Sequence, residues 1–192
     1  MSIHLILGGA RSGKSRHAEQ LAHASSLPVT VLATAEAQDD EMRLRIARHR
    51  HDRPEHWHTV ETPLHLADAL AQHARQGQCV IVDCLSLWLT NLLIASLPGI
   101  GGGGGTEALP PATLCDASSL PRFARERDAL LATLPGLRGE VLLVSNEVGL
   151  GLVPETPLGR LFRDEAGRLN QAVARCSEQV SFIAAGLPLR LK

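Results

Sequence analysis

Eight consecutive residues near the amino terminus have the types and spacing needed to hold phosphate groups. Residues 8–15 read Gly-Gly-Ala-Arg-Ser-Gly-Lys-Ser, which matches the P-loop pattern in full. Glycines let the backbone approach phosphate oxygens, and consecutive N–H groups at a helix start attract anions. We expect Lys14 to reach the terminal phosphates of a nucleoside triphosphate and Ser15 to ligate Mg²⁺. A glycine-rich turn that binds nothing is the alternative. The expected phosphate contacts are Gly8, Gly9, Ala10, Arg11, Ser12, Gly13, Lys14 and Ser15.

A carboxylate closes a short apolar run in the middle of the chain. Residues 79–83 read Cys-Val-Ile-Val-Asp, which is typical of a central parallel strand that is covered on both faces. Asp83 would stand at the end of that strand, where a carboxylate can meet the magnesium shell. A strand-end aspartate taken alone more often caps a helix, but beside a phosphate loop the metal role is favoured. Ser15 and Asp83 are therefore the expected Mg²⁺ ligands.

Histidine and arginine occur together in residues 49–61, which read His-Arg-His-Asp-Arg-Pro-Glu-His-Trp-His-Thr-Val-Glu. Three interpretations compete. Taken alone, the composition favours a charged helix end followed by a loop. A zinc site would use the histidines, but the charges of Arg50 and Arg53 oppose a cation. A phosphate-transfer site would use a neutral imidazole as nucleophile and the arginines as phosphate ligands.

Two segments further along the chain also place polar groups where a ligand could bind. Residues 145–154 read Ser-Asn-Glu-Val-Gly-Leu-Gly-Leu-Val-Pro and follow an apolar strand, so they would lie at the carboxyl end of the sheet. A plain strand-to-helix turn is an equal alternative. Arg160, Asp164 and Arg168 recur at four-residue spacing and share one helix face. Surface ion pairs usually explain such a face, and a substrate-facing or subunit-facing surface is the alternative.

The elements that must position these residues alternate between short apolar runs and longer helical patterns. This alternation predicts an α/β fold with a mostly parallel, doubly wound sheet and right-handed crossovers. We expect a single domain over residues 1–192, with a flexible Gly/Pro-rich surface loop at about 98–121. The expected strands are 3–7, 29–34, 79–83, 141–144 and 180–184. The expected helices cover about 13–24, a segment from 39, 62–75 with Thr62 as its N-cap, a segment ending near 95, 122–134 and 157–176.

Composition excludes several classes of function. The formal net charge is −1, and the chain has two Trp, three Phe and no Tyr. Neither a basic surface nor a stacking platform for nucleic acid is expected. The four cysteines fit neither a zinc knuckle nor a disulfide framework, and no segment has the length of a membrane span. These features, with no signal peptide, predict a cytoplasmic protein that binds no nucleic acid.

Four stretches resemble one family closely. They are GGARSGKSRHAE at 8–19, DDEMRLRIARHRHDRPEHWHTVE at 39–61, SNEVGLGLVPE at 145–155 and GRLFRDEAGRLNQ at 159–171. In order and spacing they are similar to the bifunctional adenosylcobinamide kinase / adenosylcobinamide-phosphate guanylyltransferases of cobalamin biosynthesis. The resemblance runs nearly end to end. The P-loop is shared by many families, whereas the second and third stretches are far more specific.

The resemblance implies two reactions at one nucleotide site. A kinase step would move a γ-phosphoryl group onto the hydroxyl of adenosylcobinamide. A guanylyltransferase step would move GMP from GTP onto that phosphate through a histidine that carries GMP covalently, and His49 fits the position of that histidine. The resemblance also implies a RecA-like P-loop domain, ATP and GTP as substrates with Mg²⁺, and a homotrimer. Beyond the phosphate loop, the nucleotide contacts it implies are Ala33, Thr34, Ala35, Arg50, His51, Asp52, Arg53, Glu61 and Asp83.

Two other functions stay open on the residues alone. A different P-loop kinase for a small metabolite would share Lys14, Ser15 and Asp83 but would not need a histidine nucleophile. A nucleotide-binding regulatory switch would need the phosphate loop without turnover. Covalent labelling by α-labelled GTP distinguishes a guanylyltransferase from the other kinase. Turnover with cobinamide distinguishes an enzyme from the regulatory switch.

Overall fold

Seven strands form one sheet that is parallel except at one edge. The computed structural model describes residues 2–36, 40, 43–44, 53–97, 117 and 120–192. In this part of the chain the sheet order is β3-β2-β4-β5-β1-β6-β7, and of these strands only β7 runs antiparallel to its neighbour. The predicted α/β class with a mostly parallel sheet is confirmed. The strands are β1 (Ser2–Gly8), β2 (Val29–Ala33), β3 (His58–Glu61), β4 (Cys79–Asp83), β5 (Glu140–Asn146), β6 (Gln179–Ala184) and β7 (Leu187–Arg190).

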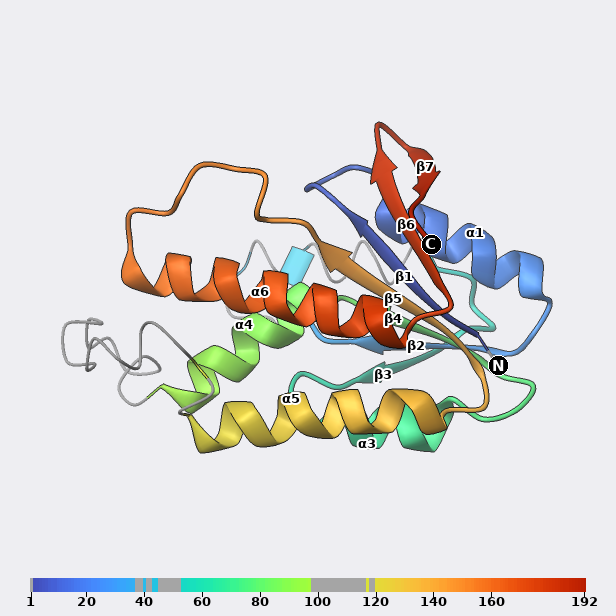
Figure 1. The fold of residues 1–192 in the computed structure, drawn as a ribbon. Helices are drawn as coiled ribbons and strands as arrows, with labels where there is room; N and C mark the ends of the chain where they lie inside the picture. The colour runs from blue at the N-terminus through green and yellow to red at the C-terminus, as the bar shows by residue number, and fades with distance from the viewer. Residues whose placement is uncertain (1, 37–39, 41–42, 45–52, 98–116, 118–119) are drawn as a thin grey trace.

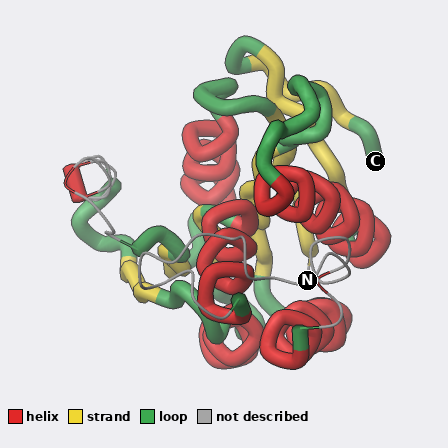
Figure 2. Tube along the Cα trace, turned by 90° about the vertical axis from the view of Figure 1, so that its left-hand side faces the viewer, coloured by secondary structure: helices red, strands yellow, loops and turns green. Residues whose placement is uncertain are grey.

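Helices cover both faces of this sheet, as the expected doubly wound arrangement requires (Figures 1 and 2). Alternate residues of β1 point to opposite faces of the sheet and pack in two different hydrophobic clusters. Leu5 packs in the cluster that includes side chains of four helices, whereas Ile6 packs with Ala18 and Ala22 of α1. Among the described helices, α1 therefore lies on one face and the others on the opposite face. The helices are α1 (Lys14–Ser25), α3 (Leu66–His73), α4 (Leu85–Ser96), α5 (Pro121–Thr133), which continues into the 3₁₀ turn η4 (Leu134–Gly136), and α6 (Pro157–Cys176).

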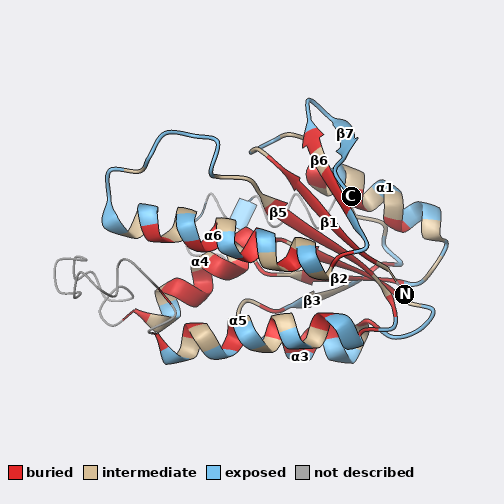
Figure 3. Ribbon diagram, in the orientation of Figure 1, coloured by how far each residue is buried: buried red, intermediate tan, exposed pale blue. Residues whose placement is uncertain are grey.

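The register brings the ends of three central strands to one edge of the sheet. Gly8 of β1 pairs with Asn146 of β5, and Asp83 of β4 pairs with Val144 of the same strand. All three strands are parallel and almost wholly buried (Figure 3). The phosphate loop after β1 and the carboxylate at the end of β4 therefore share the carboxyl edge, where open α/β sheets place their ligands.

The structure differs from the predicted elements in three places. Residues 58–61 form strand β3 instead of a loop, and residues 187–190 add the unpredicted edge strand β7. The helix expected from Thr62 begins at Leu66 with His65 as N-cap, because the Thr62 N–H donates to the Ala33 carbonyl at 2.9 Å and extends the sheet instead.

The predicted surface loop at about 98–121 is also revised at its end. Pro121 begins α5, and the described residues just before it, Ala117 and Leu120, are buried in the main core. Residues 98–116, 118 and 119 lie outside the described part of the chain. The same holds for most of the helix expected from Asp39, of which Asp40, Arg43 and Leu44 are described and helical. Within the described ranges, no helix has both the length and the apolar character needed to cross a membrane.

Candidate nucleotide-binding site

The phosphate loop joins the end of β1 to the start of α1 in a conformation that needs glycine. A Cβ at Gly8 would lie 2.5 Å from the backbone oxygen of Ile183, so no larger residue fits there. Gly13 adopts φ +102° as the N-cap of α1. The loop is also held from the far side, because Gly186 N donates to Ser12 O at 2.8 Å. The turn between β6 and β7 thus supports the loop.

Lys14 lies against this loop with little exposure to solvent. Its Nζ donates to the carbonyl of Gly9 at 2.6 Å, and the residue is 7% exposed. Burial lowers the pKa of Lys14, and the neighbouring Cys84 and Asp83 partly oppose that shift. A buried lysine ammonium binds anionic oxygens favourably, because a phosphate replaces the solvation that the ammonium has lost.

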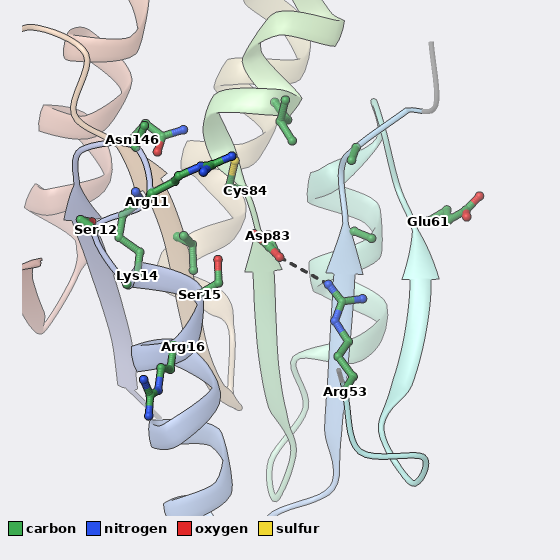
Figure 4. Close-up of a pocket in the computed structure, with 16 residues that line it drawn as sticks. Arg11, Ser12, Lys14, Ser15, Arg16, Arg53, Glu61, Asp83, Cys84 and Asn146 are labelled. Carbon is green, nitrogen blue, oxygen red and sulfur yellow. Dashed lines mark hydrogen bonds and ion pairs between the residues drawn. The ribbon is translucent and has the colours of Figure 1, made fainter. Parts of the chain in front are cut away.

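A cavity of about 660 Å³ opens over the loop, which is the size of a small-molecule site. Its walls come from the phosphate loop, α1, β2, β3 and the segment before it, β4, α4 and β5 (Figure 4). The predicted residues that line it are Ala10, Arg11, Ser12, Gly13, Lys14, Ser15, Ala33, Ala35, Arg53, Glu61 and Asp83. Segments far apart in the sequence therefore meet in one pocket.

Three of the predicted contacts, Gly8, Gly9 and Thr34, do not line the cavity. Gly8 belongs to β1, and the Gly9 carbonyl accepts the hydrogen bond from Lys14. Thr34 is fully buried, and its Oγ1 donates to the Cys84 carbonyl at 2.7 Å and accepts from Cys84 N at 2.8 Å. The Thr34 side chain therefore ties the end of β2 to the end of β4. Its backbone is engaged as well, since Thr34 N donates to the Asp83 carbonyl at 3.1 Å and the Thr34 carbonyl accepts from Asn91 Nδ2 at 2.7 Å.

The carboxylate of Asp83 is paired with a cation from the histidine-arginine segment. Arg53 Nη2 lies 3.4 Å from Asp83 Oδ2, and the Arg53 side chain is 8% exposed (Figure 4). The Ser15 hydroxyl lines the same cavity. A hydroxyl and a carboxylate that face phosphates are the protein ligands that a P-loop site offers to Mg²⁺, the rest coming from phosphate and water. The donor set therefore fits that ion.

The predicted nucleophile belongs to the histidine-arginine segment of residues 49–61. His49, Arg50, His51 and Asp52 all lie outside the described residues. Arg53 is the first described residue after them, and it enters the cavity. Within the described ranges, no three His, Cys, Asp or Glu side chains gather as a zinc site would require.

Five residues line the cavity that the sequence did not mark as contacts. They are Arg16, Cys84, Leu87, Val144 and Asn146. Burial raises the pKa of the Cys84 thiol to about 11, so this group is neutral at physiological pH. Asn146 stands in a segment that the sequence singled out only as polar. Its position beside Gly8 could be found only from the pairing of β5 with β1.

The arginine face of α6 is bonded to the segment that precedes the helix. Arg160 Nη1 donates to the carbonyls of Pro154 and Glu155, and Arg163 Nη2 donates to that of Gly149. Arg168 pairs with Glu165. On the predicted face, Arg160 therefore holds residues 154 and 155, and Arg168 forms an ion pair with the buried Glu165. Arg163, which is outside the four-residue spacing, adds the bond to Gly149.

The fold and the pocket define a P-loop nucleotide-binding protein, with a phosphate loop and a strand-end carboxylate facing one cavity. The family model described as "Cobinamide kinase / cobinamide phosphate guanyltransferase" matches residues 4–191. This chain belongs to that family.

Its relatives carry names that agree with the family. The bifunctional adenosylcobalamin biosynthesis protein CobP of Pseudomonas aeruginosa is 52% identical over 188 residues, covering 98% of this chain and 96% of the relative. The corresponding CobU proteins of Escherichia coli and Salmonella typhimurium are 39% and 38% identical, covering 98% of both chains. Among solved structures, a type III secretion ATPase is 14% identical with a TM-score of 0.39, covering 94% of this chain and 51% of that one.

Proposed function

We propose that this chain phosphorylates adenosylcobinamide and then transfers GMP from GTP to the product, yielding adenosylcobinamide-GDP and pyrophosphate. The observation that carries the proposal is the single cavity in which the phosphate loop, Lys14 and the Arg53–Asp83 pair meet. Full-length membership of a cobinamide kinase / guanyltransferase family supports the choice of substrate. The proposed partners are therefore ATP or GTP and a corrinoid, with no role for nucleic acid.

In the kinase step, the acceptor hydroxyl oxygen attacks the γ-phosphorus and the bond to the β–γ bridging oxygen breaks. A nucleoside diphosphate leaves, and the hydroxyl proton passes to solvent. The loop N–H groups and Lys14 bind the phosphates, so the protein contributes positioning and electrostatic stabilisation. The buried Ser12 Oγ has no partner among the described residues, and a phosphate oxygen would satisfy it.

In the guanylyltransferase step, a nitrogen of neutral His49 attacks the α-phosphorus of GTP and pyrophosphate leaves. An oxygen of the acceptor phosphate then attacks the same phosphorus, and the phosphorus–nitrogen bond breaks to restore the histidine. The proposal rests on a histidine next to Arg50 at the family's motif position. Arg53, three residues after Arg50, lines the cavity with its guanidinium on Asp83, which supports bringing the histidine segment to the phosphates.

Ser15 and Asp83 are the residues that would hold Mg²⁺ in this site. The ion supplies charge neutralisation for the phosphates and for the leaving pyrophosphate. Arg53 occupies only one oxygen of the Asp83 carboxylate in the structure. The other oxygen remains for the ion or for water in its shell.

The remaining nucleotide contacts that we propose come from the ends of β2 and β3. Ala33 and Ala35 line the cavity beside Glu61, and Thr34 holds the turn between them. The proposed assembly is a homotrimer, which light scattering coupled to gel filtration would test. The alternative of another small-metabolite kinase keeps every contact above except His49.

The proposed function is tested by two labels on one enzyme preparation. With γ-labelled ATP and adenosylcobinamide, label should appear in the corrinoid. With α-labelled GTP, label should first appear in denatured protein and then pass to adenosylcobinamide phosphate. A corrinoid that gains no phosphate, or a protein that never takes up α-label, would contradict the corresponding half of the proposal.

A further inference from the structure

A closed ring of buried and partly buried hydrogen bonds surrounds the peptide groups of Asn146. The Asn146 N–H donates to Ser86 Oγ at 2.7 Å, and its carbonyl accepts from Asn170 Nδ2 at 3.2 Å. Ser145 Oγ donates to Asn170 Oδ1 at 2.7 Å and lies 3.5 Å from Ser86 Oγ. With the Ser86 hydroxyl donating to Ser145, every member of the ring has a partner.

This ring draws on three elements of the fold. Ser86 comes from α4, Ser145 from β5 and Asn170 from α6, and all three are at most 6% exposed. Burying such side chains has a cost unless each is hydrogen-bonded, and a satisfied network rigidifies the groups it holds. Here both backbone polar groups of Asn146 are fixed, although the residue is at the very end of its strand.

The side chain of Asn146 takes no part in this network and lines the nucleotide cavity. No hydrogen bond to its amide is found within the described part of the chain, and Figure 4 draws that amide near Arg11 and Cys84. The adjacent Glu147 N–H donates to Gly8 O at 3.0 Å, so the chain stays bound to β1 as it leaves the sheet. A rigid backbone thus presents one free amide to the ligand.

The place of β5 in the sheet indicates which phosphate this amide meets. β5 lies between β1, which carries the phosphate loop, and β4, which ends at Asp83. Loop N–H groups of a P-loop cradle the α- and β-phosphates, whereas the strand-end carboxylate faces the metal at the β- and γ-phosphates. A side chain between the two therefore approaches the terminal phosphate.

We infer that the Asn146 side-chain amide donates a hydrogen bond to the γ-phosphate of the bound nucleotide and helps to position it for transfer. The inference deepens the proposed function and rests on its nucleotide site. Ser86, Ser145 and Asn170 are positioning residues, since they act only through the backbone of Asn146. The amide matters most for the kinase step, because the γ-phosphate moves there, whereas it leaves unchanged within pyrophosphate in the guanylyl step.

Nucleotide binding tests the inference without any corrinoid. Calorimetry should show that Asn146→Ala weakens binding of the non-hydrolysable β,γ-imido analogue of ATP by about 10-fold, the effect of losing a hydrogen bond to a charged group. Binding of ADP should change by less than about twofold. Asn146→Asp keeps the shape of the side chain but opposes the phosphate charge, so it should weaken the analogue more than Asn146→Ala does. Gln171→Ala removes an exposed amide next to Asn170 on α6 and serves as the control.

Activity at saturating nucleotide supplies the second readout. The kinase kcat of Asn146→Ala should fall by about 10- to 100-fold, while labelling by α-labelled GTP changes by less than about threefold. Equal weakening of the triphosphate analogue and ADP, or unchanged binding of both, would overturn the inference. If Asn146→Ala does not fold, Asn146→Asp takes its place in the test. The inference is overturned if Asn146→Asp binds the triphosphate analogue and ADP with the same ratio of affinities as wild type. A wild-type enzyme that discriminates as expected but phosphorylates no corrinoid would contradict the proposed function and leave the binding result standing.

Discussion

Arg53 Nη2 lies 3.4 Å from Asp83 Oδ2, joining the histidine-arginine segment to the end of a central strand. The pair is largely removed from solvent, with the two side chains 8% and 21% exposed. It lies in the wall of the nucleotide cavity. Through this contact the segment that holds the proposed nucleophile is linked to the proposed metal ligand.

Breaking the ion pair should destabilise the protein. Arg53→Gln leaves the Asp83 carboxylate without its partner, so the free energy of unfolding should fall by about 1–3 kcal/mol. A double-mutant cycle with Asp83→Asn, measured by urea unfolding, should show a coupling of about 1 kcal/mol or more. Strict additivity of the two single changes would mean that the contact does not stabilise the fold.

Removing the charge of Lys14 should impair both reactions. Lys14→Met keeps an apolar stem but loses the ammonium that we propose contacts the terminal phosphates. We expect both rates at saturating GTP to fall by a factor on the order of 100 or more, as for loss of a preorganised electrostatic contact. Steady-state assays of kinase and guanylyltransferase activity measure this, and near-normal rates would argue against the assigned role.

A methyl group at Gly8 should disturb the phosphate loop and the sheet together. A Cβ there would meet the Ile183 backbone oxygen at 2.5 Å and Ser12 Oγ at 2.7 Å. Neither the backbone of β6 nor the loop can move freely, so Gly8→Ala should cost about 2 kcal/mol or more of stability. Gly167→Ala is the matched control, since a Cβ at Gly167 meets nothing within 4 Å. Equal melting temperatures for the two variants would contradict the close approach.

Two histidines, His4 of β1 and His17 of α1, should make the stability of the fold sensitive to acid. His4 Nε2 lies 2.8 Å from Ser181 Oγ, and the His17 ring lies edge-on at 6.3 Å. Burial lowers the pKa of His4, and the charges of His17 and Arg190 add to the shift. Burial also lowers the pKa of His17.

The unfolded chain binds protons at a higher pH than the folded chain, and this difference sets the sign of the change in stability. Below the unfolded pKa of about 6.5, the unfolded chain takes up protons that the folded chain resists, so stability falls as pH falls. The melting temperature should therefore drop between about pH 7.5 and about pH 5.5. His4→Gln should reduce that drop, whereas His56→Gln, at an exposed position, should not. An identical pH dependence in wild type and His4→Gln would show that His4 is not responsible.

The sequence predicted the central sheet and the phosphate loop because both follow from local patterns. β1, β2, β4, β5 and β6 are apolar runs bounded by polar or turn residues, and the loop is set by its glycines and Lys14. By contrast, β3 is short and half exposed, and its residues are mostly polar, so its pattern resembles a loop. β7 is exposed throughout and forms only because β6 offers it an edge.

The features of the site that the sequence did not predict depend on contacts between distant segments. The turn after β6 supports the phosphate loop through Gly186, and Asn146 reaches the cavity because β5 inserts between β1 and β4. Neither relationship leaves a signal in a single stretch of sequence. Thr34 shows the reverse case, since it was predicted as a nucleotide contact but is fully buried, and its hydroxyl joins two strands.

Covalent labelling of His49 tests the proposed function most directly. Wild type, His49→Ala and His51→Ala are each incubated with α-labelled GTP, denatured and separated by electrophoresis. Wild type and His51→Ala should retain a label that is acid-labile and base-stable, as a phosphoramidate is. His49→Ala should retain none, yet it should still phosphorylate adenosylcobinamide, since that step needs no protein nucleophile. Label that persists in His49→Ala and disappears in His51→Ala would transfer the role to His51, and label that persists in both would contradict a covalent histidine in this segment.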